Sequence, residues 1–308
     1  MSPEPQKSQI TQIQQLMNAA KAGLPLLALF VVIVLGSLAA DYISSNFQSS
    51  SAYSFDDASD EGTSLFGGND ESCNVIGIEI RGCIATYKPD SADDASNLFS
   101  TDTCDTYTSS EEVVGLIESA MSADEIKGVV LEIDSTGGMP VAAEEIATAL
   151  KALGKPSVAW IRGYGDSAAY WIASSADTIV ASENSDVGSI GVTQSYVDNV
   201  KQNQTEGLTY NQLISGKYKD IGTPDRTLTL EEKALIQRDL DITYENFVRT
   251  VATNRNLTVE KVRALADGSS MLGAMAKEKG LVDVLGTKPA VWKTLEEKIS
   301  AKPEVCWP

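Results

Sequence analysis

The stretch SVAWIRGYGDSAAYWIAS, residues 157–174, decides how this chain is expected to fold. Ser157–Arg162 combines β-branched, aromatic and small residues in the pattern of a buried strand. A tight turn follows from Gly163 to Ser167, and the run after it is expected to form a helix. A strand, a tight turn and a helix in this order are typical of one parallel β-α unit.

The same alternation extends to both sides of this stretch. Short loops join the expected elements, which indicates an α/β fold with parallel strands. Capping boxes mark two helix starts, one at Ser109 with Glu112 and one at Thr229 with Glu232. Further strands are expected at Val75–Ile80, Gly128–Asp134 and Thr178–Ser182, and further helices at 109–122, 141–153, 230–254 and 258–266.

An apolar run near the N-terminus predicts a membrane anchor. Ala22–Ala40 holds 19 residues without a charge between Lys21 and Asp41, and about 20 apolar residues are needed to cross a bilayer. The alternative is a cleaved signal peptide with a cleavage site at Ser37–Ala39, but the run is long for one. The expected organisation is a cytoplasmic segment over 1–21, a transmembrane helix over 22–40, a flexible acidic linker over 41–72 and one folded domain over 73–308.

Charges beside the apolar run predict its orientation. Lys7 and Lys21 precede it, whereas eight acidic residues and no Lys or Arg lie from Asp41 up to Arg81. The positive-inside rule therefore places the N-terminus in the cytoplasm and the folded domain outside. The expected location is the cell membrane, with a single pass and an extracytoplasmic domain.

The composition excludes several functions. The 308 residues include no histidine, and 24 Lys and Arg against 43 Asp and Glu give a formal charge of −19. Such acidity argues against nucleic-acid binding. Without histidine, a Ser-His-Asp triad, an HExxH zinc site and a His-ligated haem cannot form within the chain. Any general base must be Lys, Asp, Glu, Tyr or a group on a cofactor.

Four cysteines suggest a disulfide framework rather than a metal site. The sequence has no CxxC motif and no histidine, so no metal is expected. Outside the cytoplasm disulfides are permitted, and four cysteines allow three pairings. Cys83 and Cys104 bracket a polar stretch that resembles a surface insertion, so we pair them with each other and pair Cys73 with Cys306.

Two glycine-containing segments could carry chemistry. Gly165–Ala169 nearly matches the GxSxG nucleophile elbow, in which Ser167 would stand between a strand and a helix. The alternative is that Asp166 or Ser167 only caps the helix. Gly137 and Gly138 follow an expected strand and could present backbone N–H groups to an oxyanion, or could form a plain turn.

A third segment, SGKYKDIGTP over residues 215–224, contains two lysines. A neutral lysine can act as the base for a serine, because desolvation disfavours its charged form. In a chain without histidine, lysine is the natural candidate for this role. A solvated surface lysine is the ordinary alternative at either position.

Five motifs in order resemble the signal peptide peptidase A (SppA) family of Ser-Lys proteases, in its short single-domain form. They are GVVLEIDSTGG, DSAAYWIASSADTIVA, VGSIGV, SGKYKDIGTP and LGAMAKEKGLVDVLG, and the resemblance covers about residues 75–287. It implies a ClpP/crotonase-like fold of repeated β-β-α units and no cofactor. Short members of this family imply a ring-like homo-oligomer in which a neighbouring protomer supplies the lysine.

The resemblance also implies roles for individual residues. Ser167 matches the nucleophile and Lys219 the general base, with Lys217 as the less favoured alternative. The N–H groups of Gly138 and Ser167 match the oxyanion donors. The groove would take an extended peptide as an added strand, with residues 187–192 along it. The implied substrate-binding residues are Gly137, Ala168, Gly188, Ser189, Ile190 and Gly191.

The implied function is a membrane-anchored serine endopeptidase that degrades remnant signal peptides and other hydrophobic polypeptides. Two departures from the family pattern argue for caution about activity. Ala168 and Ala169 stand where the family usually has glycine, and Thr136 replaces the usual proline. These changes support one alternative, an inactive membrane-anchored scaffold of the same fold. A crotonase-like acyl-CoA enzyme is disfavoured by the expected anchor and by the Ser-Lys pair.

Overall fold

The computed structural model describes residues 73–88, 104 and 106–308. The expected cytoplasmic segment, transmembrane helix and acidic linker lie outside these residues, as does most of the polar stretch between Cys83 and Cys104. Among the helices of the described part, none combines the length and apolar character that a bilayer span requires.

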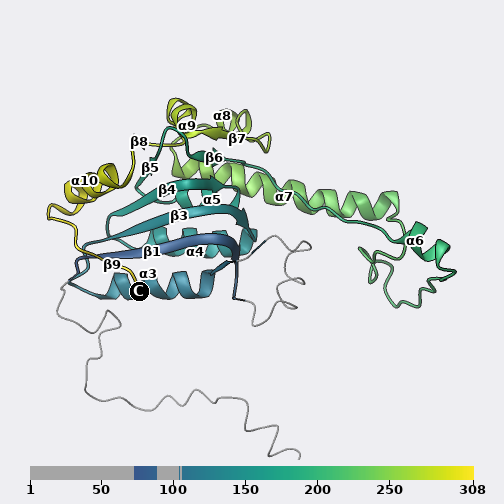
Figure 1. The fold of residues 1–308 in the computed structure, drawn as a ribbon. Helices are drawn as coiled ribbons and strands as arrows, with labels where there is room; N and C mark the ends of the chain where they lie inside the picture. Colours follow the sequence, from purple (N-terminus) through teal and green to yellow (C-terminus); the bar gives the residue numbers. More distant parts are fainter. Residues whose placement is uncertain (1–72, 89–103, 105) are drawn as a thin grey trace, which may run out of the picture. The chain divides into compact units, whose positions relative to one another are not determined.

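One largely parallel sheet organises the described residues (Figure 1). Its central strands β1 (Val75–Ala85), β3 (Gly128–Gly138) and β4 (Ser157–Asp166) pair in parallel. All other pairings are parallel except that between β6 and β7. The predicted α/β fold is thereby confirmed. The shorter strands are β2 (Tyr107–Ser109), β5 (Thr178–Ala181), β6 (Asp186–Gly188), β7 (Ser270–Leu272), β8 (Val284–Leu285) and β9 (Val305–Cys306).

The long strands run further than the sequence predicted. The expected turns at 135–138 and 163–166 are the last residues of β3 and β4. A register shift in each ladder lets pairing resume beyond it, so that Gly137 pairs with Cys83 and Gly138 with Ile84. A side chain at Gly138 would lie 2.1 Å from the Ile84 carbonyl oxygen, so only glycine allows this close approach.

Helices cover both faces of the sheet. α3 (Ser110–Ser122), α4 (Pro140–Ala152) and α5 (Ala168–Ser174) pack on one face, where the larger core lies. α10 (Lys288–Ile299) covers part of the other face over a smaller apolar cluster. Alternate strand residues serve the two cores. Each fully buried Val, Leu or Ile contributes about 1.5–3 kcal/mol relative to exposure.

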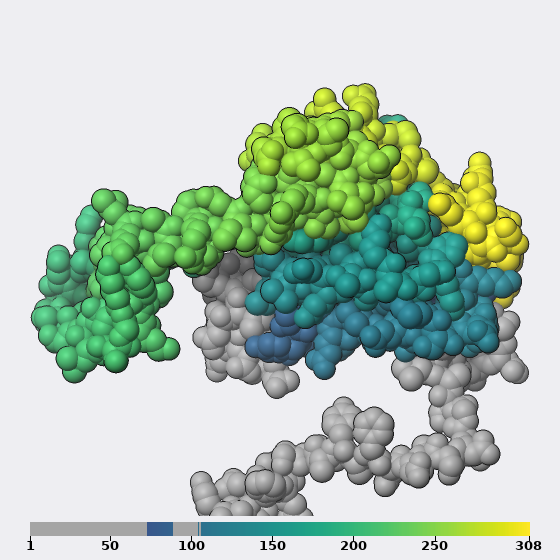
Figure 2. Space-filling model, turned by 180° about the vertical axis from the view of Figure 1, so that it is seen from behind, coloured from purple at the N-terminus to yellow at the C-terminus, as the bar shows by residue number. Residues whose placement is uncertain are grey.

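The helix α7 (Leu230–Asn254) belongs only partly to the core. Its second half buries Phe247, Val248 and Val251, whereas its first half extends away from the sheet and carries α6 (Val200–Thr205) at its far end (Figures 1 and 2). We call residues 192–242 the arm. The predicted bounds of α7 are confirmed, and so is its capping box, in which Thr229 and Glu232 exchange hydrogen bonds.

Small elements complete the C-terminal part. The helix expected over 258–266 is the shorter α8 (Val259–Arg263), and α9 (Gly273–Lys279) follows β7. At the N-terminus of α3, the Ser109 hydroxyl accepts a hydrogen bond from the Glu112 N–H as expected. The larger core lies against the central strands that the sequence predicted. The candidate site lies at the ends of these strands.

Both predicted disulfides are present in the structure. Cys73 pairs with Cys306 across 233 residues of sequence, and Cys83 pairs with Cys104 across 21. Cys73 precedes β1 and Cys306 lies in β9, which pairs with the start of β1. The long-range bond therefore ties the C-terminus to the strand that begins the described domain.

We expect the Cys73–Cys306 bond to contribute more stability than the shorter one. Removing it with Cys73→Ser/Cys306→Ser should lower the free energy of unfolding by about 2–5 kcal/mol, because the unfolded chain regains a long loop. Chain entropy predicts a loss about 2 kcal/mol smaller for Cys83→Ser/Cys104→Ser. Denaturant unfolding of both variants measures this, and an equal or larger loss for the short loop would contradict the ranking.

Candidate active site

Ser167 stands at a strained junction between β4 and α5. Its backbone has φ +52° and ψ −124°, a conformation that is unfavourable for any residue with a side chain. Its hydroxyl makes no capping hydrogen bond to the helix that it begins. The alternative in which Ser167 serves as an ordinary helix cap is therefore wrong. The strand, strained turn and helix instead match the geometry of a nucleophile elbow.

Gly137 packs directly against this serine. A side chain at residue 137 would place its first carbon 2.8 Å from the Ser167 Cβ and 3.1 Å from its Oγ. Gly137 also has φ +116°, which favours glycine independently of space. The structure thus brings Ser167 and the Gly137–Gly138 pair together, because β3 and β4 are neighbours that end at the same edge of the sheet.

The backbone donors near Ser167 differ from the expected set. The Ser167 N–H donates to the Gly188 carbonyl oxygen at 2.8 Å, so this group is occupied and is not available to an oxyanion here. The reason is that β6 pairs with the end of β4 and brings Gly188 alongside. Ala168 is the first residue of α5, so its N–H has no acceptor within the helix. This N–H lies at the positive end of the helix dipole.

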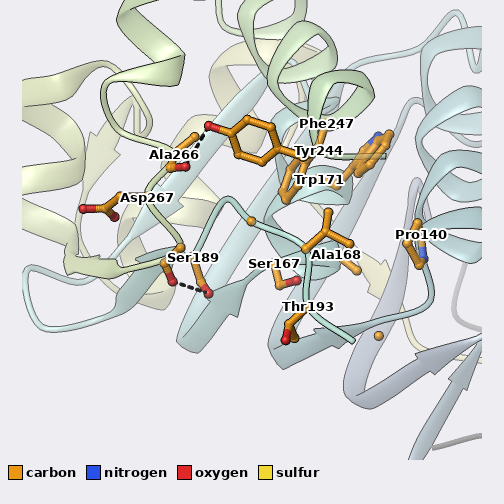
Figure 3. Close-up of a pocket in the computed structure, with 14 residues that line it drawn as sticks. Pro140, Ser167, Ala168, Trp171, Ser189, Thr193, Tyr244, Phe247, Ala266 and Asp267 are labelled. Atoms are coloured by element: carbon orange, nitrogen blue, oxygen red, sulfur yellow. Dashed lines mark hydrogen bonds between the residues drawn. The ribbon is translucent and has the colours of Figure 1, made fainter. Parts of the chain in front are cut away.

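A cavity of about 400 Å³ opens beside Ser167. Trp171 from α5 and Tyr244 and Phe247 from α7 form an aromatic wall (Figure 3). The Trp171 and Phe247 rings stack with centroids 4.8 Å apart, and the Tyr244 hydroxyl donates to the Ala266 carbonyl oxygen. Figure 3 shows these rings on one side of the cavity and Ser167 with Thr193 on the other. The cavity can take an apolar side chain next to the serine hydroxyl.

The segment 187–192 only partly lines this cavity. Ser189 and Gly191 face it together with Ala168, as expected. The Ile190 side chain is fully buried in the hydrophobic core and does not line the cavity, so its contact with substrate stays a prediction. Gly137 and Gly188 shape the site by contacting Ser167 rather than by lining the cavity.

After Gly191 the chain stays extended towards α6. From Gly191 to Asp198 it forms no backbone hydrogen bond to another residue in the part that the structure describes. The backbone groups of this segment are therefore available to pair with an extended peptide.

The lysine motif lies apart from the cavity. No lysine is among the described residues that line it. Lys219 is exposed in a turn on the arm, and this turn is held near α6 by the bond from the Asn199 N–H to the Pro224 carbonyl oxygen (Figure 1). Within one chain, the structure does not bring Ser167 and Lys219 together.

The two lysines of the motif have different surroundings. The Lys217 Nζ lies 2.6 Å from Glu231 Oε2, and hydrogen bonds to Glu231 and Tyr218 raise the pKa of Lys217. This favours the charged form of Lys217, which cannot accept a proton. The Lys219 side chain makes no hydrogen bond or ion pair with the residues that the structure describes. Of the two amines, that of Lys219 is therefore the one available to contact another group.

Asp166, directly before the serine, is a buried carboxylate outside the predicted site. Burial raises its pKa to about 6, with repulsion from Asp186 as the second cause. One of its oxygens, Oδ1, has no hydrogen-bond partner among the described residues. Asp166 therefore does not cap α5, and its ionised form destabilises the fold. No sequence pattern indicated this burial. Nor did any pattern place Tyr244 and Phe247 in the cavity, because they are distant in sequence and look like ordinary core residues of α7.

The sequence comparisons point to a protease family. The model of peptidase family S49 matches residues 149–302. A protein of Methanocaldococcus jannaschii named as a candidate protease is 37% identical over 195 residues, 62% of this chain and 63% of that protein. A candidate signal peptide peptidase SppA of Enterococcus faecium is 35% identical over 52% of this chain and 48% of its own length.

A more distant relative carries a similar name. The chloroplastic serine protease SPPA of Arabidopsis thaliana is 29% identical over 57% of this chain and 26% of its own length. The chain thus spans less than two thirds of each of these three relatives.

We expect Asp166→Asn to stabilise the protein at neutral pH but not in acid. The folded-state pKa of about 6 lies above the usual 3.8, so the wild type loses stability as the pH rises between these values, and the loss persists at pH 7. The amide carries no such penalty. Melting temperatures of both proteins from pH 4 to pH 8 measure the difference. A gain of the same size at pH 4 and pH 7 would show that ionisation is not the cause.

Proposed function

The chain belongs to peptidase family S49, and we propose that it is a serine endopeptidase in which Ser167 attacks the peptide bond and Lys219 is the general base. The observation that carries this proposal is the strained, uncapped Ser167 packed against Gly137 and lining a cavity with an aromatic wall. Strain of this kind persists only where the surrounding structure enforces it, and it is concentrated at functional sites.

The chemistry follows from these groups. Ser167 Oγ adds to the scissile carbonyl carbon while its proton passes to the neutral amine of Lys219. The N–H groups of Gly138 and Ala168 donate to the resulting oxyanion. As the C–N bond breaks, the Lys219 ammonium returns the proton to the leaving amine. Water then attacks the acyl-enzyme with Lys219 again as base, which frees the acid and restores Ser167.

In this proposal Lys219 reaches Ser167 of another copy. The cavity contains no lysine among its described lining residues, and Lys219 stands on the arm. The arm exposes large apolar side chains, with Val197 82%, Leu213 97% and Leu230 87% accessible. Exposed apolar residues in one region are typical of a protein interface. A homo-oligomer would bury them and deliver the lysine, and a head-to-tail contact would close into a ring.

The cavity and the extended segment indicate the substrate class. The aromatic wall of the cavity beside Ser167 favours hydrophobic side chains, and the unpaired backbone of 191–198 would hold an extended peptide as an added strand. We propose that remnant signal peptides and other hydrophobic polypeptides are the substrates. The Enterococcus relative's name supports this choice. The apolar run at 22–40 supports anchoring in the cell membrane with the protease domain outside.

The finer fold assignment is also part of the proposal. Helices follow β3 and β4 directly, and short strands continue the edge of β4, as repeated β-β-α units of the ClpP/crotonase kind require. The inactive scaffold finds no support in the site itself. Ala168 and Ala169 are buried, yet a cavity of about 400 Å³ remains beside Ser167.

Substitution of the two catalytic residues tests the proposal. Ser167→Ala and Lys219→Ala should each lower kcat/KM for an internally quenched hydrophobic peptide by roughly 10⁴-fold or more, since nucleophile and base act as a unit. Lys217→Ala is the matched control and should retain most activity. Circular dichroism should show an unchanged fold in each variant. Full activity of purified Lys219→Ala would overturn the assignment of the base.

Serine labelling separates the enzyme from the inactive scaffold. A fluorophosphonate probe should modify Ser167 in the wild-type protein, because a base activates its hydroxyl. Mass spectrometry identifies the modified residue. Absence of labelling at every pH, in a folded and assembled sample, would favour the scaffold.

A further inference from the structure

The turn that carries Lys219 makes several exposed side-chain contacts. Lys217 and Tyr218 donate to Glu231 in the first turn of α7, and Tyr210 and Gln212 donate to Asp220. The Lys219 N–H donates to the Gly216 carbonyl oxygen at 3.0 Å, and the Ile221 N–H donates to that of Tyr218 at 3.1 Å. These are bonds within the turn, and Lys219 itself is exposed. A base that must reach a serine on another chain needs its turn fixed to something rigid, because a misplacement of about 1 Å can lower a rate about 100-fold.

A less exposed connection to α7 runs through one arginine. The Arg226 guanidinium donates to both oxygens of Glu232, from Nη1 at 2.8 Å and from Nη2 at 2.6 Å. Its Nη2 also donates to the backbone carbonyl oxygen of Asp220 at 3.0 Å, and its Nε lies 3.6 Å from the Asp220 carboxylate. Asp220 is the residue after Lys219. Arg226 therefore joins the lysine turn to the first turn of α7.

Glu232 is in turn fixed to the helix. It accepts hydrogen bonds from the Thr229 N–H at 2.9 Å and from the Thr229 hydroxyl at 3.0 Å, as part of the capping box of α7. Its side chain is only 5% exposed, whereas the other acidic partners of ion pairs on α7, which are Glu231, Asp239 and Glu245, are at least 43% exposed. The lysine turn is thus connected through two side chains to a 25-residue helix whose far half lies in the core.

A largely buried ion pair is unusual on the arm, which is otherwise exposed. A surface ion pair contributes little stability, and a buried one often contributes no more than an apolar pair of the same volume. What a bidentate arginine–carboxylate pair does provide is fixed geometry. The hydrogen bonds from Arg226 and Thr229 lower the pKa of Glu232 to about 2, so the pair stays charged at any pH suited to an assay.

We propose that Arg226 and Glu232 are positioning residues for the general base, which hold the turn of Lys219 at a fixed place on α7 so that its amine meets the serine. This inference rests on the proposed role of Lys219. It predicts that the ion pair affects the chemical step and leaves peptide binding unchanged, because neither Arg226 nor Glu232 lines the cavity or belongs to the extended segment 191–198.

The test compares Arg226→Gln and Glu232→Gln with Arg238→Gln. The last variant is the control, because it removes an exposed arginine from α7. Each of the first two should lower kcat at least tenfold with KM unchanged, and the rate of fluorophosphonate labelling of Ser167 should fall equally. The double variant should be no worse than either single variant, because both break one connection. Arg226→Lys should recover part of the loss, and Arg238→Gln should behave as wild type.

Two measurements keep this inference separate from its premises. Hydrogen exchange at the amides of Lys219 and Ile221 should quicken in Arg226→Gln and not in Arg238→Gln, whether or not the protein cleaves peptides. Size-exclusion chromatography with light scattering gives the assembly state of each variant. Unchanged exchange, or unchanged kcat in an intact assembly, would overturn the positioning role.

A loss of activity that follows only from disassembly would also overturn the inference. A wild-type protein whose Ser167 is not labelled and which cleaves no peptide would instead refute the proposed function. In that case the exchange result still decides whether Arg226 holds the turn.

Discussion

The contact between Gly137 and Ser167 is the constraint on which the site depends. Ser167 keeps a strained backbone because β4 continues to Asp166 and α5 starts immediately afterwards. That junction fits beside β3 only because residue 137 has no side chain. The parallel register of β3 and β4 brings the glycine pair and the serine to one edge. The aromatic wall from α5 and α7 then closes a cavity around the hydroxyl.

The absence of histidine shapes everything outside that edge. A serine without histidine needs another base, and the proposed base, Lys219, stands on the arm rather than in the cavity. In this proposal the nucleophile and the base are on separate parts of the chain. The exposed apolar residues of the arm, its largely buried ion pair and the unpaired extended segment would then belong to a surface that contacts a second copy.

Local sequence patterns predicted much of the fold and part of the site. Patterns within a few residues predicted the bounds of α7, its capping box and the alternation of strands and helices. The two disulfides follow from the polar stretch that Cys83 and Cys104 bracket, which leaves Cys73 and Cys306 as the other pair. The ends of β3 and β4 were missed, because glycines that look like turns are strand residues once a neighbouring strand pairs with them. A motif assigned Ile190 to substrate binding and the Ser167 N–H to the oxyanion, whereas tertiary packing buries the Ile190 side chain in the core and pairs the Ser167 N–H with Gly188.

The central claim is that serine and lysine meet across two chains, and complementation tests it most directly. Ser167→Ala and Lys219→Ala proteins would be unfolded together, refolded as mixed assemblies and assayed for peptide cleavage. In a head-to-tail ring with equal, random mixing, about one quarter of the sites receive an intact serine and an intact lysine, so about one quarter of wild-type activity is predicted. Mixed assemblies as inactive as their parents, when co-refolded wild-type chains regain full activity, would contradict the account.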